Sequence, residues 1–421
     1  MAGTGTFVIV GGGLAAATAA EGLRQGGFEG RIVLVGGEHH LPHERPPLSK
    51  GYLHGNEALE SAFVHPREWY VEQEVDLRLG TMVRTVDLDG HTVTVGEEQV
   101  VFERLLIATG ASARRVPVAH DAGAPLTYLR TIEDSQRIRA ALQAGRRIAV
   151  IGGGWIGLEV AAAARTAGCD VVVIEALERP LLRVLGSAVA EVFADLHRSH
   201  GVDLRTNMSV TSVEAHAGRA LMHLADGSGV KADLLVVGVG VSPNTALADT
   251  AGLKVDNGVV VDEFLRTSHP DVFAAGDVAN AYHPRLGRHL RVEHWDNAIS
   301  QGRTAARNML GAGEPYQRLP YFFTDQYDLG MEYVGSIGPA GYDEVVLRGD
   351  ARGHTFTAFW LKDDAVLAGM HANDGDAIEP IRQIVTAQNV DLTALRDAGV
   401  PLDQLVLNAS GGPDNSRGGD Y

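Results

Sequence analysis

The sequence predicts an α/β protein with two parallel-sheet domains, followed by a smaller α+β domain at the C-terminal end. The parallel sheets are indicated twice: an apolar strand, a glycine-rich turn, an alanine-rich helix and a second apolar strand occur at residues 6–35 and again at 147–175. The α+β domain is indicated by alternating strands with one helix after about residue 321. Because continuous apolar strands are typical of buried parallel sheets, we interpret each repeat as a Rossmann-like βαβ unit.

Composition excludes several classes of protein. A chain of 421 residues exceeds what one hydrophobic core normally supports, and its net charge of −17 argues against a nucleic-acid or membrane-surface binder. The single cysteine, Cys169, excludes an internal disulfide and a redox-active cysteine pair, and is typical of a reducing compartment. No secretory signal and no apolar run of about 18 residues is present, so we expect a soluble, cytoplasmic protein.

The first glycine loop, Gly11-x-Gly13-x-x-Ala16, follows the strand Thr6–Val10 and opens a helix. Gly11 allows the tight turn, Gly13 lets the backbone approach a pyrophosphate, and Ala16 keeps the helix close to the strand. The phosphates are expected at the positive end of the helix. An acidic residue about 20 positions further on is expected to bind the ribose of the dinucleotide, and Glu38 is the candidate.

The second loop, Gly152-x-Gly154-x-x-Gly157, has the stricter form of the motif and the same strand–helix context. The next strand ends at Glu175, whose carboxylate is expected to accept the ribose hydroxyls of NADH and to repel the 2′-phosphate of NADPH. The nearby Arg179 and Arg183 would weaken this preference for NADH.

Shorter elements are expected in the rest of the chain. The predicted strands are Val75–Leu79, Val83–Leu88, His91–Val95, Leu105–Gly110, Val259–Val261, Val272–Asp277, Thr355–Leu361 and Ala365–His371. The predicted helices are Asn297–Leu310 and Ile378–Ala387. Residues 408–421, rich in glycine, serine, asparagine and aspartate, are predicted to be disordered.

Two further short motifs, Ala108-Thr109-Gly110 and Ala275-Gly276-Asp277, follow predicted strands. With the two glycine loops in this order, the chain resembles the two-dinucleotide flavoproteins that include glutathione reductase. The strings His43-Glu-Arg-Pro-Pro-Leu-Ser-Lys50 and Phe323-Thr-Asp-Gln-Tyr-Asp-Leu329 are more specific. They resemble ferredoxin reductases of the putidaredoxin reductase kind, which serve Rieske-type oxygenases and haem-thiolate monooxygenases. The resemblance covers about residues 6–405.

The resemblance implies an FAD-binding domain formed by 1–112 and 243–320, an NAD-binding domain at 113–242, and a C-terminal α+β domain at 321–407. Together with the first loop, it implies the FAD-binding residues Gly11, Gly13, Leu14, Ala15, Ala16, Glu38, Arg45, Lys50, Val83, Ala108, Thr109, Gly110, Arg130, Gly276, Asp277 and Trp295. The NAD-binding residues are Gly152, Gly154, Ile156, Gly157, Glu159, Glu175, Arg183 and Gly240. Two positions depart from the family pattern: Gly37 replaces an acidic residue, and Phe323 replaces a tryptophan.

Lys50 and Glu159 are the candidate catalytic residues, because related flavoproteins pair a lysine with a glutamate beside the flavin N5. A fixed cation there stabilises negative charge that develops on the reduced ring, and the pair neutralises itself when it is buried. Cys169 lies at the far end of the second nucleotide helix, away from the flavin. Electrons are therefore expected to leave the flavin directly, and a flavin can accept a hydride from NADH and release single electrons to a 2Fe–2S ferredoxin.

Arg303 and Arg307 lie one helical turn apart, so both side chains can face the same way. The position of Arg303 matches a docking arginine in the ferredoxin reductases that the chain resembles, which implies that the acidic ferredoxin binds at these arginines. The histidines His39, His40, His43 and His54 do not have the spacing of a metal-ligand set, so no metal is expected. We expect a monomer or weak homodimer without nucleic-acid or membrane partners. Three alternatives are an NADH oxidase, a small-molecule reductase like monodehydroascorbate reductase, and a redox-sensing protein like apoptosis-inducing factor.

Overall fold

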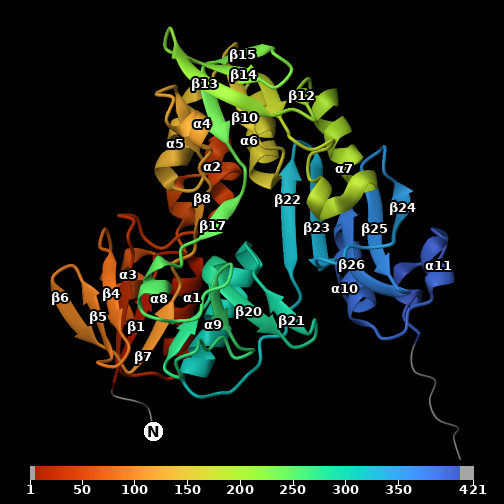
Figure 1. Cartoon of the computed structure of the whole chain (residues 1–421). Coiled ribbons are helices and arrows are strands. Elements are labelled where there is room, and N and C mark those ends of the chain that lie inside the picture. Colours follow the sequence, from red (N-terminus) through yellow and green to blue (C-terminus); the bar gives the residue numbers. More distant parts are fainter. Residues whose placement is uncertain (1–4, 408–421) are drawn as a thin grey trace, which may run out of the picture. The chain divides into compact units, whose positions relative to one another are not determined.

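The computed structural model describes residues 5–407, and Figure 1 shows its elements along the chain. The chain divides between Arg318 and Leu319 into two compact units. The predicted disorder at 408–421 concerns residues outside the described part of the chain. Within residues 5–407, no helix is both long and apolar enough to cross a membrane.

The first unit contains two parallel sheets, each built on one of the predicted βαβ units. In the first sheet the strand order is β19 (Val272–Ala274), β7 (Arg104–Ile107), β1 (Thr6–Val10), β2 (Arg31–Val35) and β3 (Val75–Arg78). In the second sheet it is β12 (Asp203–Arg205), β11 (Asp170–Ile174), β10 (Arg147–Ile151), β16 (Leu234–Val237) and β9 (Leu126–Tyr128). The central strands are buried, which explains their continuous apolar sequences.

The first sheet joins segments from both ends of the first unit, since β19 pairs with β7 across more than 160 residues of chain. This arrangement supports the discontinuous FAD-binding domain, whose boundaries remain our proposal. Smaller sheets complete the unit. They are formed by β4 (Val83–Asp87), β5 (Thr92–Val95) and β6 (Glu98–Val101); by β8 (Ala111–Ala113) and β17 (Val241–Pro243); by β13 (Val210–His216), β14 (Arg219–Leu224) and β15 (Gly229–Ala232); and by β18 (Val259–Val261), β20 (Ala279–His283) and β21 (Arg288–Leu290).

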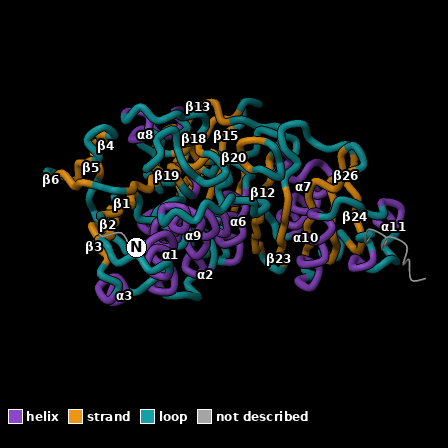
Figure 2. The backbone as a smooth tube through the Cα atoms, turned by 90° about the horizontal axis from the view of Figure 1, so that it is seen from below, coloured by secondary structure: helices purple, strands orange, loops and turns teal. Residues whose placement is uncertain are grey.

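Helices cover these sheets. They are α1 (Leu14–Gln25), α2 (Gly51–His54), α3 (Arg67–Glu72), α4 (Pro117–His120), α5 (Ile132–Ala141), α6 (Trp155–Thr166), α7 (Leu182–Ser199), α8 (Ala246–Thr250) and α9 (Trp295–Met309). α1 and α9 lie side by side in both views (Figures 1 and 2). Two glycines allow this close packing: a Cβ at Gly302 would lie 2.6 Å from the Ala15 carbonyl oxygen, and one at Gly22 would lie 2.9 Å from the Ala306 Cβ.

The second unit is an antiparallel sheet with two short helices. Its strand order is β22 (Tyr321–Gln326), β23 (Leu329–Gly335), β26 (Ala365–Ala372), β25 (Thr355–Lys362) and β24 (Glu344–Asp350), and its helices are α10 (Ile378–Thr386) and α11 (Leu392–Arg396). Trp360 and Phe359 are fully buried and form part of its core. Phe323, which replaces the family tryptophan, lies on β22 opposite Glu332.

Two sequence-based expectations are corrected. The helix predicted to begin at Asn297 begins at Trp295, because the His294 ring, an unusual cap, accepts a hydrogen bond from the Asp296 N–H. The strands predicted at Leu105–Gly110 and Val272–Asp277 end earlier, at Ile107 and Ala274, because the chain turns away from the sheet at Gly110 and Gly276, which have positive φ angles. The predicted strand Val259–Val261 is confirmed as β18, which pairs with β20 in a small separate sheet.

Candidate functional site

The first glycine loop connects β1 to α1. Gly11 has a φ of 144°, and a Cβ there would lie 2.0 Å from the Ala108 carbonyl oxygen, so a side chain is excluded. Gly13 has a φ of −105°, and no heavy atom lies within 4 Å of the position that its Cβ would occupy. The loop therefore presents an open cradle in front of a helix N-terminus, which fits the pyrophosphate of a dinucleotide.

The turn after β19 meets the first turn of α1, which is formed by Leu14–Ala16. Gly276 has a φ of 80°, and a Cβ there would lie 3.0 Å from the Ala15 Cβ. The Gly276 N–H donates to the Gln301 Oε1 of α9 at 2.9 Å. The packing of α9 on α1 thus places Gly276 and its neighbour Asp277 beside the first glycine loop.

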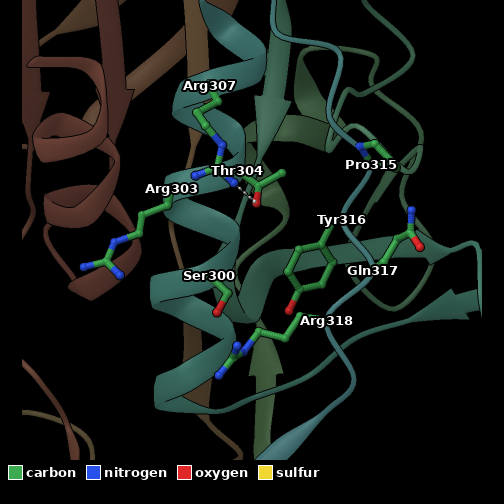
Figure 3. A pocket seen from close by; sticks show the side chains of 8 residues that line it. All are labelled: Ser300, Arg303, Thr304, Arg307, Pro315, Tyr316, Gln317 and Arg318. Carbon is green, nitrogen blue, oxygen red and sulfur yellow. Dashed lines mark hydrogen bonds between the residues drawn. The ribbon is translucent and has the colours of Figure 1, made fainter. Parts of the chain in front are cut away.

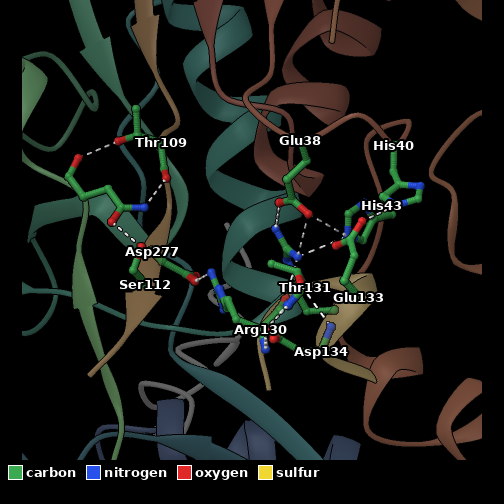
Figure 4. A network of polar contacts seen from close by, with 12 residues as sticks. Glu38, His40, His43, Thr109, Ser112, Arg130, Thr131, Glu133, Asp134 and Asp277 are labelled. Atoms are coloured by element: carbon green, nitrogen blue, oxygen red, sulfur yellow. Dashed lines mark hydrogen bonds and ion pairs between the residues drawn. The ribbon is translucent and has the colours of Figure 1, made fainter. Parts of the chain in front are cut away.

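A network of ion pairs connects Asp277 to the loop around residue 40 (Figure 4). The Asp277 carboxylate accepts a hydrogen bond from the Arg130 Nη2 at 2.7 Å. The Arg130 carbonyl accepts from the Arg45 Nη1 at 2.6 Å, and the Arg45 Nη2 donates to the Glu38 Oε1 at 2.5 Å. Burial alone would raise the pKa of Glu38, but the charge and the hydrogen bond of Arg45 lower it overall. Glu38, the candidate ribose ligand, is therefore an oriented carboxylate.

The buried His43 and the partly buried His294 lie close to this network in their neutral form. The His43 Nδ1 lies 2.9 Å from the Leu41 carbonyl oxygen and its Nε2 lies 3.1 Å from the Arg45 Nη1, so a ring with its proton on Nδ1 satisfies both contacts. Burial, reinforced by the charge of Arg45, lowers the pKa of His43 to about 4. Burial also lowers the pKa of His294 to about 4, with opposing contributions from Asp296 and other charges.

These pKa values predict that acid destabilises the protein. Between about pH 6.5 and pH 4 the unfolded chain binds protons on both histidines while the folded chain does not, so stability falls as the pH falls through this window. We expect a loss of roughly 2 kcal/mol per histidine between pH 6.5 and pH 5, measured by urea unfolding. His43→Gln cannot titrate and should flatten the profile; a variant profile as steep as that of the wild type would contradict this account.

Two further positions predicted to contact FAD, Val83 and Trp295, each stand at the start of an element. Val83 begins β4, and Trp295 begins α9. Burial raises the pKa of Glu44, and the nearby Trp295 side chain opposes this shift. At Gly37, where the family pattern has an acid, a Cβ would lie 2.5 Å from the Sδ of Met82, an exposed and flexible side chain that would have to move aside.

Ala108, Thr109 and Gly110 follow β7, where the chain leaves the first sheet. The Thr109 Oγ1 donates to the Asn244 carbonyl, and the Asn244 side-chain amide donates to the Thr109 carbonyl, both at 2.8 Å. The Ser112 hydroxyl also donates to the Asn244 Oδ1 at 2.8 Å. Asn244 therefore links β8 and β17, the two paired strands that connect the two Rossmann-like halves.

The second glycine loop repeats the geometry of the first. Gly152 has a φ of 103°, and its Cβ would lie 2.4 Å from the Gly238 carbonyl oxygen. At Gly157 a Cβ would lie 2.1 Å from the Gly152 carbonyl oxygen, which explains the close helix–strand contact. Gly154 has a φ of −82°, and the Gly238 carbonyl oxygen, its nearest neighbour, is 3.7 Å from its Cβ position. Gly240 has open space at its Cβ position. This loop fits a second pyrophosphate.

Glu175 follows β11 and faces the second loop. Its Oε2 accepts from the Gly153 N–H at 2.7 Å and its Oε1 accepts from the Leu177 N–H at 2.8 Å. Each carboxylate oxygen can accept a further hydrogen bond, so the ribose role stays available. Ile156 is 42% exposed at the start of α6, and Arg183 is exposed at the start of α7.

Replacing only the charge of Glu175 tests the predicted coenzyme preference. Glu175→Gln keeps the size of the side chain and removes the repulsion of the 2′-phosphate. We expect the ratio of kcat/KM for NADH to that for NADPH to fall about tenfold or more, which corresponds to about 1.4 kcal/mol. Glu178→Gln, three residues along, is the control and should leave the ratio unchanged. A wild type that already prefers NADPH would overturn the assignment.

The structure brings the two candidate catalytic residues together across 109 positions of sequence. The Lys50 Nζ lies 2.5 Å from the Glu159 Oε1. Glu159, on α6, is 6% exposed, and the Lys50 side chain is 18% exposed. The ion pair connects the segment after β2 to α6, the nucleotide helix of the second sheet.

Cys169 follows α6 and is fully buried. Its thiol donates to the Gln143 carbonyl oxygen, and burial raises its pKa. A buried thiol with a raised pKa is a poor nucleophile, which agrees with a packing role.

Arg303 and Arg307 both lie on α9 and line a cavity of about 260 Å³ with Ser300, Thr304, Pro315, Tyr316, Gln317 and Arg318 (Figure 3). Arg307 pairs with Glu314 at 2.6 Å, whereas the Arg303 guanidinium lies 3.9 Å from Glu21 and its side chain is 52% exposed. Arg303 is therefore the more accessible cation of the two.

Among residues 5–407, one group of three side chains has potential ligand atoms close enough together to bind a metal ion. Potential ligand atoms of His91, His269 and Asp271 lie within 4.8 Å of one another. Arg104 already donates to Asp271 at 2.5 Å and supplies a competing positive charge. None of these residues belongs to the histidine group considered from the sequence, and the absence of a metal remains a prediction.

Comparison with known proteins agrees with this geometry. Residues 5–302, more than half of the chain, match the family model described as pyridine nucleotide-disulphide oxidoreductase, and residues 321–406 match the model described as reductase C-terminal. The chain belongs to the pyridine nucleotide-disulphide oxidoreductase family.

Individual relatives indicate which proteins within this family the chain is similar to. The chain is 42% identical to the ferredoxin–NAD(+) reductase component of the anthranilate 1,2-dioxygenase system of Burkholderia cepacia, covering 90% of this chain and 94% of that protein. It is 38% identical to putidaredoxin reductase of Pseudomonas putida, covering 96% and 97%. The crystal structure of the covalent putidaredoxin reductase–putidaredoxin complex matches with a TM-score of 0.91 and 38% identity, covering 95% of this chain and 97% of that chain. The resemblance stated from the sequence is confirmed.

The individual site roles remain predictions, but the structure adds residues that the sequence did not indicate. Ser49, Asn244 and Gln301 each hold a predicted site residue in place. Asn244 and Gln301 lie outside the motifs found in the sequence, and Ser49, although it belongs to the string His43–Lys50, was given no role of its own. Their contacts join residues 25 to 135 positions apart, so no short-range pattern could have revealed them.

Proposed function

We propose that this protein is an NADH-dependent ferredoxin reductase, which supplies electrons through a 2Fe–2S ferredoxin to a monooxygenase or a Rieske dioxygenase. The enzyme is an FAD- and NAD(H)-dependent oxidoreductase. The observation that carries the proposal is the pair of open glycine cradles joined by the Lys50–Glu159 ion pair in a chain that has a single, buried cysteine. The relatives named as ferredoxin–NAD(+) reductases and as putidaredoxin reductase support it.

Different residues of the chain have different roles in binding the two cofactors and in the reaction. The first loop and helix α1 hold the FAD pyrophosphate, while Asp277, paired with Arg130, faces this site as a carboxylate. The second loop and Glu175 hold NADH. When bound, FAD supplies the chemistry that the chain lacks, because it accepts two electrons as a hydride and returns them singly. Lys50 contributes a fixed positive charge, which favours the reduced, more negative form.

The absence of a cysteine pair determines which group accepts electrons from FAD. Disulfide reductases with this fold pass electrons through a pair of thiols, and Cys169 is the only cysteine in the sequence. The ferredoxin must therefore approach the FAD site directly. A cytoplasmic location and a monomeric or weakly dimeric state complete the proposal.

Arg303 is the proposed docking cation for the acidic ferredoxin. Arg303→Glu should raise the Michaelis constant for ferredoxin several-fold, and more at low salt, because docking charges act mainly on association and are screened over about 10 Å at 0.1 M salt. Reduction of ferricyanide, which requires no docking surface, should change little.

Lys231→Glu is the matched control, since it makes the same change in net charge at an exposed position on β15. A control that is impaired as much as Arg303→Glu would show that net charge matters and α9 does not. Equal impairment of Arg303→Glu with ferricyanide would show damage to the FAD site.

A further inference from the structure

A buried serine completes the contacts of the Lys50–Glu159 pair. Ser49 is 3% exposed, and its hydroxyl donates to the Glu159 Oε2 at 2.5 Å. Its hydroxyl also lies within reach of the Pro46 carbonyl oxygen, at the longer distance of 3.3 Å. A hydroxyl carries one proton, and a charged acceptor at the shorter distance takes it. The two oxygens of Glu159 are thus bound by consecutive residues, Oε2 by Ser49 and Oε1 by Lys50.

This arrangement restricts the carboxylate in a way that lysine alone does not. An ammonium group is a point charge on a flexible four-carbon chain and imposes little direction on its partner. The second hydrogen bond fixes the plane of the carboxylate and leaves Oε1 directed at the Lys50 Nζ. Because Glu159 is buried, loss of this bond would also leave Oε2 without its donor from Ser49 in a place with little access for water.

The loop that carries Ser49 is held by other contacts. The Ser135 hydroxyl of α5 donates to the Leu48 carbonyl at 2.8 Å. Leu48, Tyr52 and Ile132 form a small buried hydrophobic cluster. Removing the Ser49 hydroxyl should therefore change the orientation of the carboxylate and leave the loop in place.

We propose that Ser49 is a positioning residue, which acts through Glu159 to set the place of the Lys50 ammonium and hence the rate of hydride transfer to FAD. The inference rests on the proposed function. It also makes Ser49 and Lys50 a two-point connection between the loop of the first Rossmann-like half and the helix α6 of the second.

The test compares Ser49→Ala, Ser49→Thr and the control Ser61→Ala, whose hydroxyl donates only to the nearby Ala58 carbonyl. Anaerobic stopped-flow reduction over a range of NADH concentrations separates the limiting rate from the dissociation constant of NADH. Ser49→Ala should lower the limiting rate about tenfold with less than a twofold change in the dissociation constant. The reduction potential of bound FAD, an equilibrium measurement, should fall. Ser49→Thr keeps the hydroxyl and should recover most of the rate.

A double-mutant cycle with Glu159→Gln distinguishes positioning from general damage. If Ser49 acts through Glu159, Ser49→Ala should have little further effect in the Glu159→Gln background. Additive effects, or a Ser49→Ala rate and potential within error of the wild type, would overturn the inference. Failure of the wild type to accept electrons from NADH would instead overturn the proposed function, so the two failures are distinguishable.

Discussion

Gly13→Val is expected to give a folded protein that contains no FAD. Gly13 has an extended φ of −105°, and the space around its missing Cβ is open, so the chain itself accommodates valine. The branched side chain would fill the cradle where the pyrophosphate must approach. The purified variant should be colourless, with less than about a tenth of the FAD of the wild type and unchanged circular dichroism.

Gly11→Val changes the same loop and serves as a comparison for Gly13→Val, because it is expected to affect folding itself. Its φ of 144° and the 2.0 Å approach to the Ala108 carbonyl oxygen mean that valine there strains the protein itself. This variant should misfold, whereas Gly13→Val should not. A folded Gly13→Val protein with full FAD content would refute the assignment of the first loop.

Gly154→Val is expected to stay yellow and to lose reduction by NADH. Gly154 has a φ of −82° and only a distant neighbour, the Gly238 carbonyl oxygen at 3.7 Å, so valine is tolerated in the absence of a nucleotide. Blocking the second pyrophosphate should lower kcat/KM for NADH by about 100-fold or more, which corresponds to about 2.7 kcal/mol. A chemical reductant such as dithionite needs no nucleotide site and should still reduce the FAD.

Gly13→Val and Gly154→Val distinguish the roles of the two loops, because each variant is expected to impair the binding of one cofactor. Loss of FAD from Gly154→Val, or normal NADH kinetics in it, would contradict the division of cofactors between the loops. If the first loop bound NADH and the second bound FAD, the two results would be exchanged.

The βαβ units could be predicted from the sequence because their information is local. The predicted strands Thr6–Val10 and Arg147–Ile151 coincide with β1 and β10, since five buried apolar residues before a glycine turn have few other interpretations. Helix α7 was not predicted. It is interrupted at Gly186, which has a non-helical φ of 72°, and it begins after a left-handed residue, Leu181.

The site was only partly predictable for a related reason. The sequence indicated that Lys50 and Glu159 matter, and the structure shows them in contact. It did not indicate that Arg45 connects Glu38 to the Arg130 carbonyl, because such contacts depend on how the two sheets are placed. It singled out Arg303 by resemblance, but it did not indicate that Arg307 pairs with Glu314 at 2.6 Å.

The central claim is that electrons from NADH leave the bound FAD singly for a 2Fe–2S ferredoxin. It is tested most directly by reducing the enzyme with one equivalent of NADH without oxygen and then mixing it with an oxidised 2Fe–2S ferredoxin. The account predicts rapid reoxidation of FAD with two ferredoxins reduced per NADH, and much slower reoxidation by oxygen alone. FAD that stays reduced with ferredoxin but is rapidly reoxidised by oxygen would contradict the claim and identify an oxidase.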